Sequence, residues 1–407
     1  MNKNIIILLA AIFTMLIPAS TLRAFETGDV QIHGFYSQGY LKTNHNNYLA
    51  ETEEGSLQFD EFGVNFSAQL TDSLHAGLQL FGRDLGPVGN NEVRLDWAFL
   101  DYRWQDWLGV RIGKTKSTQG LYNEVRDLDM LRTSIMLPQS VYSELWRDSF
   151  ATARGLTLYG VTPASVLGKL AYTVSVGVFD LDKDTGFASA FKDSLAQSSI
   201  FLNVESMDHR YMNSLAFTWY PPLDGLRLKY SFFDIKDFEL TGTASIPAYG
   251  VSSTRILYEV PEFDGWTGSL EYMLGNLTLV GEYSKNDFKG RMDLGLGMGF
   301  QDRPPLPSEG WYVSTDYRFC DWFSAAVTYS SYFPNMNDTR GENEAVDFLA
   351  WLKTWTLSTR FDINSYWIVK FEASYNDGFG AYDSMSNVPA DLDRYWMLYA
   401  VKATVHF

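Results

Sequence analysis

The sequence predicts an all-β fold: a sixteen-stranded antiparallel transmembrane β-barrel with long extracellular loops and short periplasmic turns. Three observations lead to this prediction. Apolar and polar residues alternate with a period of two along most of the chain, as in strands whose two faces meet different surroundings. The connections between these segments are alternately short and long, which places all tight turns at one end of a barrel. One face of the strands is apolar, and the other carries too many charges for a narrow packed core.

Residues 1–24 have the layout of a secretory signal peptide. Lys3 supplies a charged start, Ile5 to Met15 an apolar run, and Ala24 a small residue for cleavage. The apolar run is too short to cross a hydrocarbon layer of about 30 Å, so export is favoured over a membrane anchor. The barrel is therefore predicted to occupy residues 25–407.

Composition limits the possible functions. The chain carries 32 basic and 49 acidic side chains, a net charge of −17, which argues against nucleic acid as a partner. Cys320 is the only cysteine, which excludes an internal disulfide framework, a four-cysteine zinc site and attachment of a c-type haem. We therefore predict no cofactor.

Sixteen segments read as strands. They span residues 29–41, 57–71, 74–85, 93–104, 108–115, 153–162, 169–180, 211–220, 226–237, 265–274, 277–288, 310–319, 323–332, 351–361, 366–377 and 394–407. The predicted long connections are 42–56, 86–92, 116–152, 181–210, 238–264, 289–309, 333–350 and 378–393. An even number of strands places both termini beside the short turns.

The last strand shows which face meets lipid. Tyr395, Tyr399 and Val401 share one face, while Lys402 and Thr404 share the other. Both faces are in suitable surroundings when the apolar face of each strand contacts lipid and the polar face lines a water-filled lumen.

Aromatic residues gather near the strand ends, where girdles at the two membrane interfaces are expected. The residues expected there are Trp104, Trp107, Trp219, Tyr220, Trp266, Trp311, Trp322, Trp351 and Trp367.

The segment 117–150 is the longest interruption of the strand pattern. It mixes charged residues with apolar ones such as Leu121, Leu131 and Leu137. Insertions of this length between strands are usually functional. The apolar content favours packing on the barrel wall with the charges facing the passage. Packing as an external cap or against another subunit would also bury the apolar residues.

Two stretches carry a family resemblance. Val30 to Tyr40 is an alternating segment around Gly34, and Arg94 to Arg103 leads through Val110 to Lys114 into the long third loop. With sixteen strands, eight long loops and a terminal Phe407, the mature chain resembles bacterial outer-membrane porins, and is nearest to poorly characterised proteobacterial porin-like proteins. The short acidic tip of the best-known general porins is missing from the third loop.

The resemblance implies several further properties. The third loop would fold into the lumen and set the constriction, and the protein would form homotrimers in the outer membrane of a Gram-negative bacterium. Phe407 would act as the C-terminal signal read by the outer-membrane assembly machinery.

Two sets of charged residues are candidates for the site. The candidate constriction residues in the loop are Glu124, Arg126, Asp127, Asp129, Arg132, Glu144 and Arg147. The candidate basic residues of the lumen wall are Arg111, Lys169, Arg227, Lys229, Arg318, Arg360, Lys370 and Lys402, and Glu271, Glu282, Asp316 and Glu372 share the wall with them. A base-rich wall favours anions and an acidic chain favours cations, so the sequence leaves ion selectivity open.

These observations predict a porin, a water-filled channel for passive diffusion of ions and small hydrophilic solutes. The alternative is a barrel that acts as a scaffold or sheath for a partner protein, for example an electron-transfer conduit, or as a surface receptor.

An enzyme is not expected. The five histidines, His33, His45, His75, His209 and His406, lie in no recognisable nucleophile motif. Glu124, Asp127 and Asp129 lack the glycine-turn spacing of a calcium loop, so no metal site is predicted either.

Overall fold

The computed structural model describes residues 30–407 except 87, 164, 197–198, 382–386 and 389–390. The predicted signal peptide lies outside these residues. The strands are β1 (Val30–Thr43), β2 (Phe59–Thr71), β3 (Leu74–Leu85), β4 (Arg94–Gln105), β5 (Leu108–Lys116), β6 (Thr152–Val161), β7 (Lys169–Phe179), β8 (Phe201–Asp208), β9 (Tyr211–Tyr220), β10 (Leu226–Ile246), β11 (Val251–Leu274), β12 (Leu277–Asp293), β13 (Gln301–Asp302), β14 (Ser308–Cys320), β15 (Phe323–Phe333), β16 (Leu352–Asp362), β17 (Trp367–Gly378) and β18 (Tyr395–His406).

Helices are few and short. They are η2 (Asn123–Val125), η3 (Asp129–Leu131), α2 (Arg147–Phe150), α3 (Gly186–Ala196), η4 (Pro247–Tyr249) and η5 (Asp347–Ala350). Among the described residues, no helix is long and apolar enough to cross a membrane.

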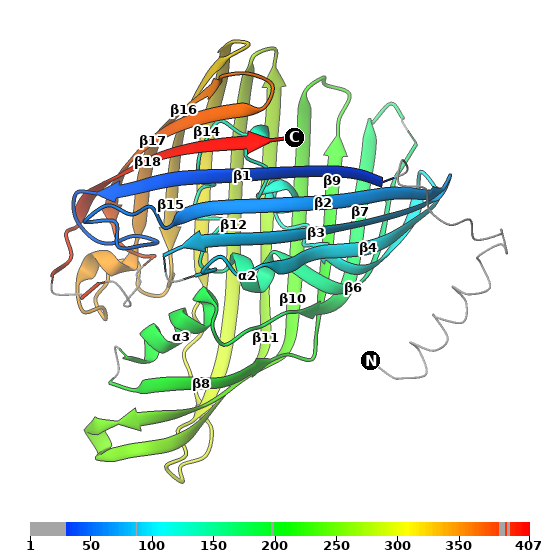
Figure 1. Cartoon of the computed structure of the whole chain (residues 1–407). Helices are drawn as coiled ribbons and strands as arrows, with labels where there is room; N and C mark the ends of the chain where they lie inside the picture. The colour runs from blue at the N-terminus through cyan, green and yellow to red at the C-terminus, as the bar shows by residue number, and fades with distance from the viewer. Residues whose placement is uncertain (1–29, 87, 164, 197–198, 382–386, 389–390) are drawn as a thin grey trace.

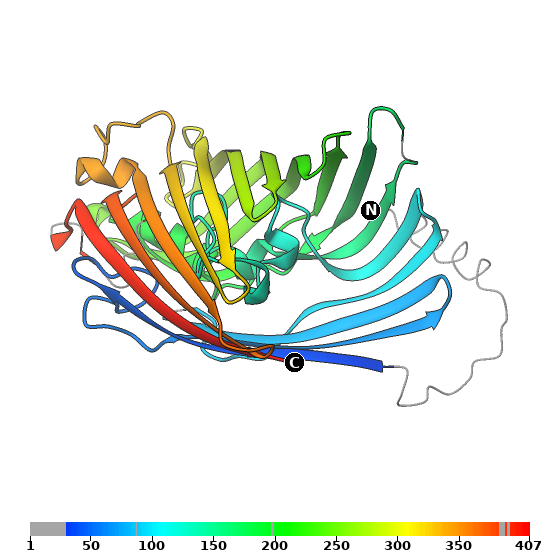
Figure 2. The same ribbon diagram turned by 90° about the horizontal axis from the view of Figure 1, so that it is seen from above.

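Sixteen of the strands form one closed antiparallel barrel, which confirms the predicted fold class (Figures 1 and 2). Each wall strand pairs with its neighbours in the chain, and β1 pairs with β18 from Phe35↔His406 to Thr43↔Leu398 to close the ring. β8 and β13 are additional strands: among the described residues, β8 pairs only with the second half of β10, from Glu239 to Ser245, and β13 only with β12. Closure satisfies the backbone of every wall strand, as a lipid environment requires.

The C-terminal residue lies against the first strand. The Phe407 N–H donates to the carbonyl oxygen of Gly34 at 3.0 Å, and the Gly34 N–H donates to the carbonyl oxygen of Phe407 at 3.2 Å. A Cβ on Gly34 would lie 2.7 Å from the Phe407 ring, so only glycine leaves room for that ring. The Phe407 side chain itself is exposed.

The prediction of a long connection over residues 238–264 is wrong. β10 and β11 continue through most of this range and are joined only by the turn around Gly250. The segment looks like a loop because it contains two prolines and two glycines, yet Pro261 lies at a register shift between Glu259 and Glu262, where a strand tolerates proline.

The strand extension carries an apolar cluster that reaches Phe150 of α2. Phe187 and Phe191 of α3 pack on Phe238 and neighbouring residues of β10 and β11, with Phe191 and Phe238 stacked at a centroid distance of 5.8 Å. Figure 1 shows α3 beside β8 and the extended ends of these strands. The predicted loop 181–210 therefore contains a helix and a strand.

The two barrel faces follow the predicted alternation. On β18, Tyr395, Tyr399 and Val401 are exposed on the outer face, whereas Lys402 and Thr404 are buried on the inner face. At the loop end, however, the inner face is apolar, because Trp396, Leu398 and Ala400 pack with residues of the loops around positions 49, 349 and 379.

Aromatic rings form rows on the outer face of β10 to β12 and of β15 and β16. Tyr230, Trp266 and Tyr283 follow one another at 6.1 and 5.3 Å, and Tyr329 contacts Trp355 at 4.8 Å. Such a row matches an interfacial girdle. Trp351 does not belong to it, because its indole is buried and donates to Asp377 at 3.1 Å.

Candidate functional site

The segment between β5 and β6, residues 117–151, is called L3 below. Its ends meet where the Ser117 N–H donates to the carbonyl oxygen of Ala151 at 2.8 Å. From there L3 runs inside the barrel and contacts the inner wall of β3 and of β10 to β18 (Figure 2). It is not an external cap.

The first attachment point of L3 is the buried carboxylate of Glu282 on β12. It accepts hydrogen bonds from the Leu121 N–H at 2.9 Å, from the Tyr142 and Tyr312 hydroxyls at 2.6 Å each, and from the Ser269 hydroxyl at 2.7 Å. Burial, followed by the negative charge of Glu282, raises the pKa of Tyr142, so this phenol stays a donor. Two of the four donors belong to L3.

The second attachment point is Asp129, which is 1 % exposed. Its carboxylate lies 3.0 Å from the Lys402 ammonium and 3.5 Å from the Lys370 ammonium, and it accepts from the Thr404 hydroxyl at 2.8 Å. Burial alone would raise the pKa of Asp129, but Lys370, Lys402 and Arg132 outweigh it and hold this pKa well below its usual range. The loop residue therefore stays ionised between two wall cations.

Further contacts fix the middle of L3. The Ile135 N–H donates to Glu372 of β17 at 2.8 Å, and Arg360 of β16 donates to the carbonyl oxygen of Met130 at 2.6 Å. Lys370 also donates to the carbonyl oxygen of Ser134 at 3.0 Å. Charged wall residues thus bond to the backbone of L3 as well as to its side chains.

The third attachment point joins L3 to the opposite wall. Arg147 lies 2.6 Å from Asp127 within L3, and Lys116 bridges Asp127 and Asp96. Nearby, Arg83 of β3 lies 2.7 Å from Glu144 and 3.1 Å from Asp148 of L3.

Two carboxylates of this third attachment point have strongly shifted pKa values. Burial alone would raise the pKa of Glu144, but Arg126 and Arg83 outweigh it and lower that pKa from 4.5 to about 2. Burial alone would also raise the pKa of Asp148, but Arg83 and Arg147 outweigh it and lower that pKa from 3.8 to about 2. Both groups are therefore ionised at neutral pH and paired with arginine.

These shifts fix the direction of an acid effect. Because the folded pKa values are depressed, the pairs contribute stability that is complete above the unfolded value of 4.5 and is lost as the pH falls toward 2. We expect the thermal unfolding temperature in detergent to decline over this window. The double variant Glu144→Gln/Asp148→Asn should start lower and decline less steeply, and a decline as steep as in the wild type would contradict the assignment.

The structure separates the predicted loop residues into two groups. Arg126, Asp127, Asp129, Glu144 and Arg147 lie in the ion pairs described above, between L3 and the wall or within L3. Glu124 and Arg132 line a cavity of about 990 Å³, and Arg132 also pairs with Asp129 at 3.0 Å. Most of the predicted constriction charges therefore hold the loop, and two face open space.

The wall residues also differ among themselves. Arg227, Lys229, Arg318 and Arg360 line the same cavity, whereas Lys370 and Lys402 are covered by L3. Arg111 lies apart from the cavity and pairs with Asp101 at 2.8 Å. Lys169 is exposed at the first residue of β7 and does not line the cavity either.

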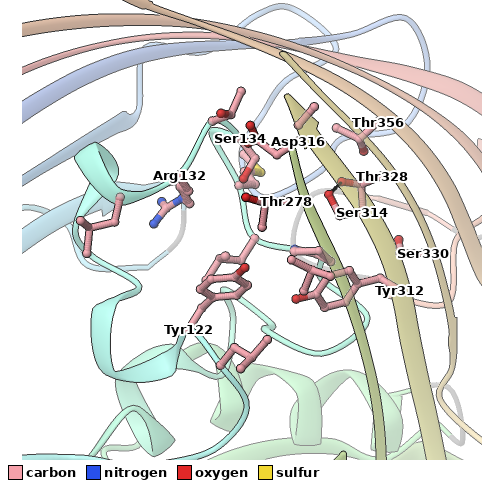
Figure 3. A pocket seen from close by; sticks show the side chains of 18 of the residues that line it. Tyr122, Arg132, Ser134, Thr278, Tyr312, Ser314, Asp316, Thr328, Ser330 and Thr356 are labelled. Atoms are coloured by element: carbon pink, nitrogen blue, oxygen red, sulfur yellow. Dashed lines mark hydrogen bonds between the residues drawn. The ribbon is translucent and has the colours of Figure 1, made fainter. Parts of the chain in front are cut away.

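The cavity lies between L3 and the inner wall of β9 to β18 (Figure 3). Its lining includes Tyr332 and Leu352 at the loop end of the barrel and Gly275 and Asp362 at the turn end, so it extends along most of the wall. A second cavity of about 800 Å³ lies on the other side of L3, next to Arg83, Arg94 and Asp180. L3 thus divides the lumen.

The charges that line the 990 Å³ cavity are balanced. They comprise five basic residues and five acidic ones, namely Arg132, Arg227, Lys229, Arg318, Arg360, Glu124, Glu271, Asp316, Asp362 and Glu372. Each of the five cations lies within 4.0 Å of a carboxylate. Each lining cation is therefore paired with a carboxylate, whereas the lining carboxylate of Asp316 is in none of these pairs.

Sequence reasoning missed the uncharged polar part of this wall. Ser314, Thr328, Thr356 and Ser374 are in register on β14 to β17 and line the cavity, and Figure 3 labels the first three. The signal was present as serine and threonine on the polar face of four successive strands, but charged residues alone were selected as candidates. No group of three His, Cys, Asp or Glu side chains suited to a metal occurs in the described part of the chain.

Comparisons with known proteins agree with this geometry. No family model matches the chain, and no curated protein does. Among solved structures, outer-membrane expressed OmpT of Vibrio cholerae is similar with 13 % identity and a TM-score of 0.56, over 95 % of this chain and 100 % of that one. OmpF of Salmonella typhi, in complex with daunomycin, has 11 % identity and a TM-score of 0.57 over 93 % and 97 %. An anion-selective porin from Comamonas acidovorans has 12 % identity and a TM-score of 0.54 over 93 % and 99 %.

At these identities the comparisons define the fold. The chain has the fold of the sixteen-stranded outer-membrane porins, with the apolar outer face and the inward third loop described above.

Proposed function

We propose that the protein is a passive diffusion channel in the outer membrane of a Gram-negative bacterium. Ions and small hydrophilic solutes would cross it down their own gradients. The observation that carries this proposal is the polar cavity of about 990 Å³ left open beside L3 inside a closed barrel whose outer face is apolar. A barrel with this distribution of residues is stable in lipid and leaves its interior to water.

The position of L3 argues against the sheath alternative. A sheath needs a lumen wide enough for a partner protein, whereas L3 occupies the lumen and is tied to both of its walls. Removing it would break several buried ion pairs, each costly to separate.

We also propose that the protein is not an enzyme. The lumen carboxylates that a reaction could use are engaged: Glu282 holds four donors, Glu271 pairs with Arg227 at 2.7 Å, and Glu372 accepts from Ile135 and Ser358. His209 accepts from the Phe179 N–H and lies away from the cavity lining.

A homotrimer is part of the proposal. OmpT of Vibrio cholerae, which shares the fold at 12 % identity and a TM-score of 0.50, is described in a trimer form.

Planar lipid bilayers test the channel and the trimer together. Purified protein should produce stepwise conductance, and each inserted unit should close under high voltage in three equal steps. Absence of conductance would contradict the channel, and closure in a single step would contradict the trimer.

A further inference from the structure

The uncharged part of the cavity wall has a regular form. Ser314, Thr328, Thr356 and Ser374 are direct cross-strand neighbours on β14 to β17, and we call this row together with the next one the hydroxyl panel. Ser314 and Thr328 are hydrogen-bonded at 2.8 Å, and Thr356 and Ser374 at 2.9 Å. Neighbouring strands lie about 4.8 Å apart, so the row presents hydroxyls at that spacing.

The second row lies two residues closer to the loop end. It consists of Tyr312, Ser330, Thr354 and Asn376, which are again in register, and Thr354 donates to Asn376 at 2.7 Å. All four line the same cavity. A hydroxyl has one donor and two acceptor sites, so a hydroxyl bonded to one neighbour still has capacity for a solute.

The opposite side of the cavity belongs to L3 and is largely apolar. Leu121, Leu131 and Pro138 line it, and Tyr122 lies across from the panel in Figure 3. The Tyr122 hydroxyl donates to Glu271 at 3.3 Å, so its bond is directed to the wall and the ring is what borders the space. An aromatic ring of this kind packs on the C–H face of a solute.

The charged residues of the lining offer little to an ionic solute. Arg227 lies 2.7 Å from Glu271, Arg360 lies 2.6 Å from Asp362, and Arg132 lies 3.0 Å from Asp129. A carboxylate that entered would shed water and meet only cations that already lie beside a carboxylate, which is unfavourable. A solute whose hydroxyls both donate and accept would exchange its hydrogen bonds with water for hydrogen bonds with the panel at a small cost in free energy.

We propose that the channel favours uncharged polyhydroxylated solutes of monosaccharide size, which contact the hydroxyl panel with their hydroxyls and L3 with their C–H faces. This inference rests on the proposed channel function and adds the solute class. The volume of about 990 Å³ lies within the range of about 300–1,000 Å³ that is usual for sites enclosing small molecules.

Flux through proteoliposomes tests the solute class. D-glucose and D-gluconate, which are similar in size and differ in charge, are loaded at physiological salt and their efflux is measured. We expect glucose to leave faster by about tenfold, and the potassium-to-chloride permeability ratio to stay within about twofold of one, because basic and acidic residues of the lining are equal in number. Equal fluxes of the two solutes, or a permeability ratio beyond about fivefold, would overturn the inference.

Variants of the panel locate the effect. Ser314→Ala, Thr328→Val, Thr356→Val and Ser374→Ala are combined, and glucose flux is expected to fall about tenfold while potassium chloride conductance changes less than about twofold. Retained conductance shows that the variant folds. Thr315→Val on the outer face is the matched control, and it should leave both quantities unchanged. Unchanged glucose flux in the combined variant would overturn the role of the panel, whereas absence of any conductance in the wild type would remove the channel itself.

Discussion

Replacing Asp129 with asparagine is expected to lower the free energy of unfolding by about 3–5 kcal/mol, because a buried ion pair is broken from one side. Lys370 and Lys402, both about as buried as Asp129, would lose the carboxylate that lies 3.5 and 3.0 Å away. Thermal unfolding in detergent, followed by loss of β-sheet circular dichroism, measures the effect. Single-channel current should also become noisier, since L3 loses one of its attachment points.

A control and a rescue separate this mechanism from a general loss of charge. Asp182→Asn removes an exposed carboxylate that lies 3.8 Å from Arg94, and it should cost less than about 1 kcal/mol. Adding Lys370→Met and Lys402→Met to Asp129→Asn removes all three buried charges and should restore most of the lost stability. Equal effects of the Asp129 and Asp182 variants would contradict the assignment.

Glu282→Gln is expected to destabilise the protein by about 1–3 kcal/mol and to loosen the part of L3 that borders the cavity. The carboxylate accepts from four donors, and an amide has one oxygen for them and brings an NH₂ group that faces the Tyr142 and Tyr312 hydroxyls. Single-channel conductance should rise and fluctuate more, because Leu121 and Tyr122 line the passage.

The matched control for this variant is Glu309→Gln. Glu309 lies on the outer face of β14 and accepts one bond, from Tyr283 at 2.6 Å. It should change stability little and conductance not at all. If the two glutamine variants gave the same conductance trace as the wild type, Glu282 would not be fixing L3.

Much of the barrel could be predicted because the two faces of a strand are visible in its own sequence as an alternation of apolar and polar residues. The alternation around Tyr395 to Thr404 is visible in sequence, and every wall strand has this property. The extension of β10 and β11 was missed because Pro261 and the nearby glycines are also loop signals. Only the apolar face of α3, far along the chain from Ile256, explains why these residues remain strands.

The site was less predictable because its chemistry depends on distant pairs. Asp129 and Lys402 are 273 positions apart, and the residues around each of them do not show that the two side chains form an ion pair. The composition of the loop indicated charges beside apolar residues, and the structure shows which of those charges form ion pairs with residues of the barrel wall. Glu124 and Arg132 remain at the cavity, and the uncharged Thr328 and Ser374 line it as well.

The central claim is that solutes cross the barrel through the cavity between L3 and the hydroxyl panel. Thr328→Cys, made in a Cys320→Ser background to remove the exposed native thiol, places a reactive group on that cavity. A cationic methanethiosulfonate reagent added to a single open channel should reduce its conductance at least about twofold, because the attached group fills the passage. Thr315→Cys on the outer face should not respond. Unchanged conductance after labelling of Thr328→Cys, with the modification verified by mass spectrometry, would contradict the account.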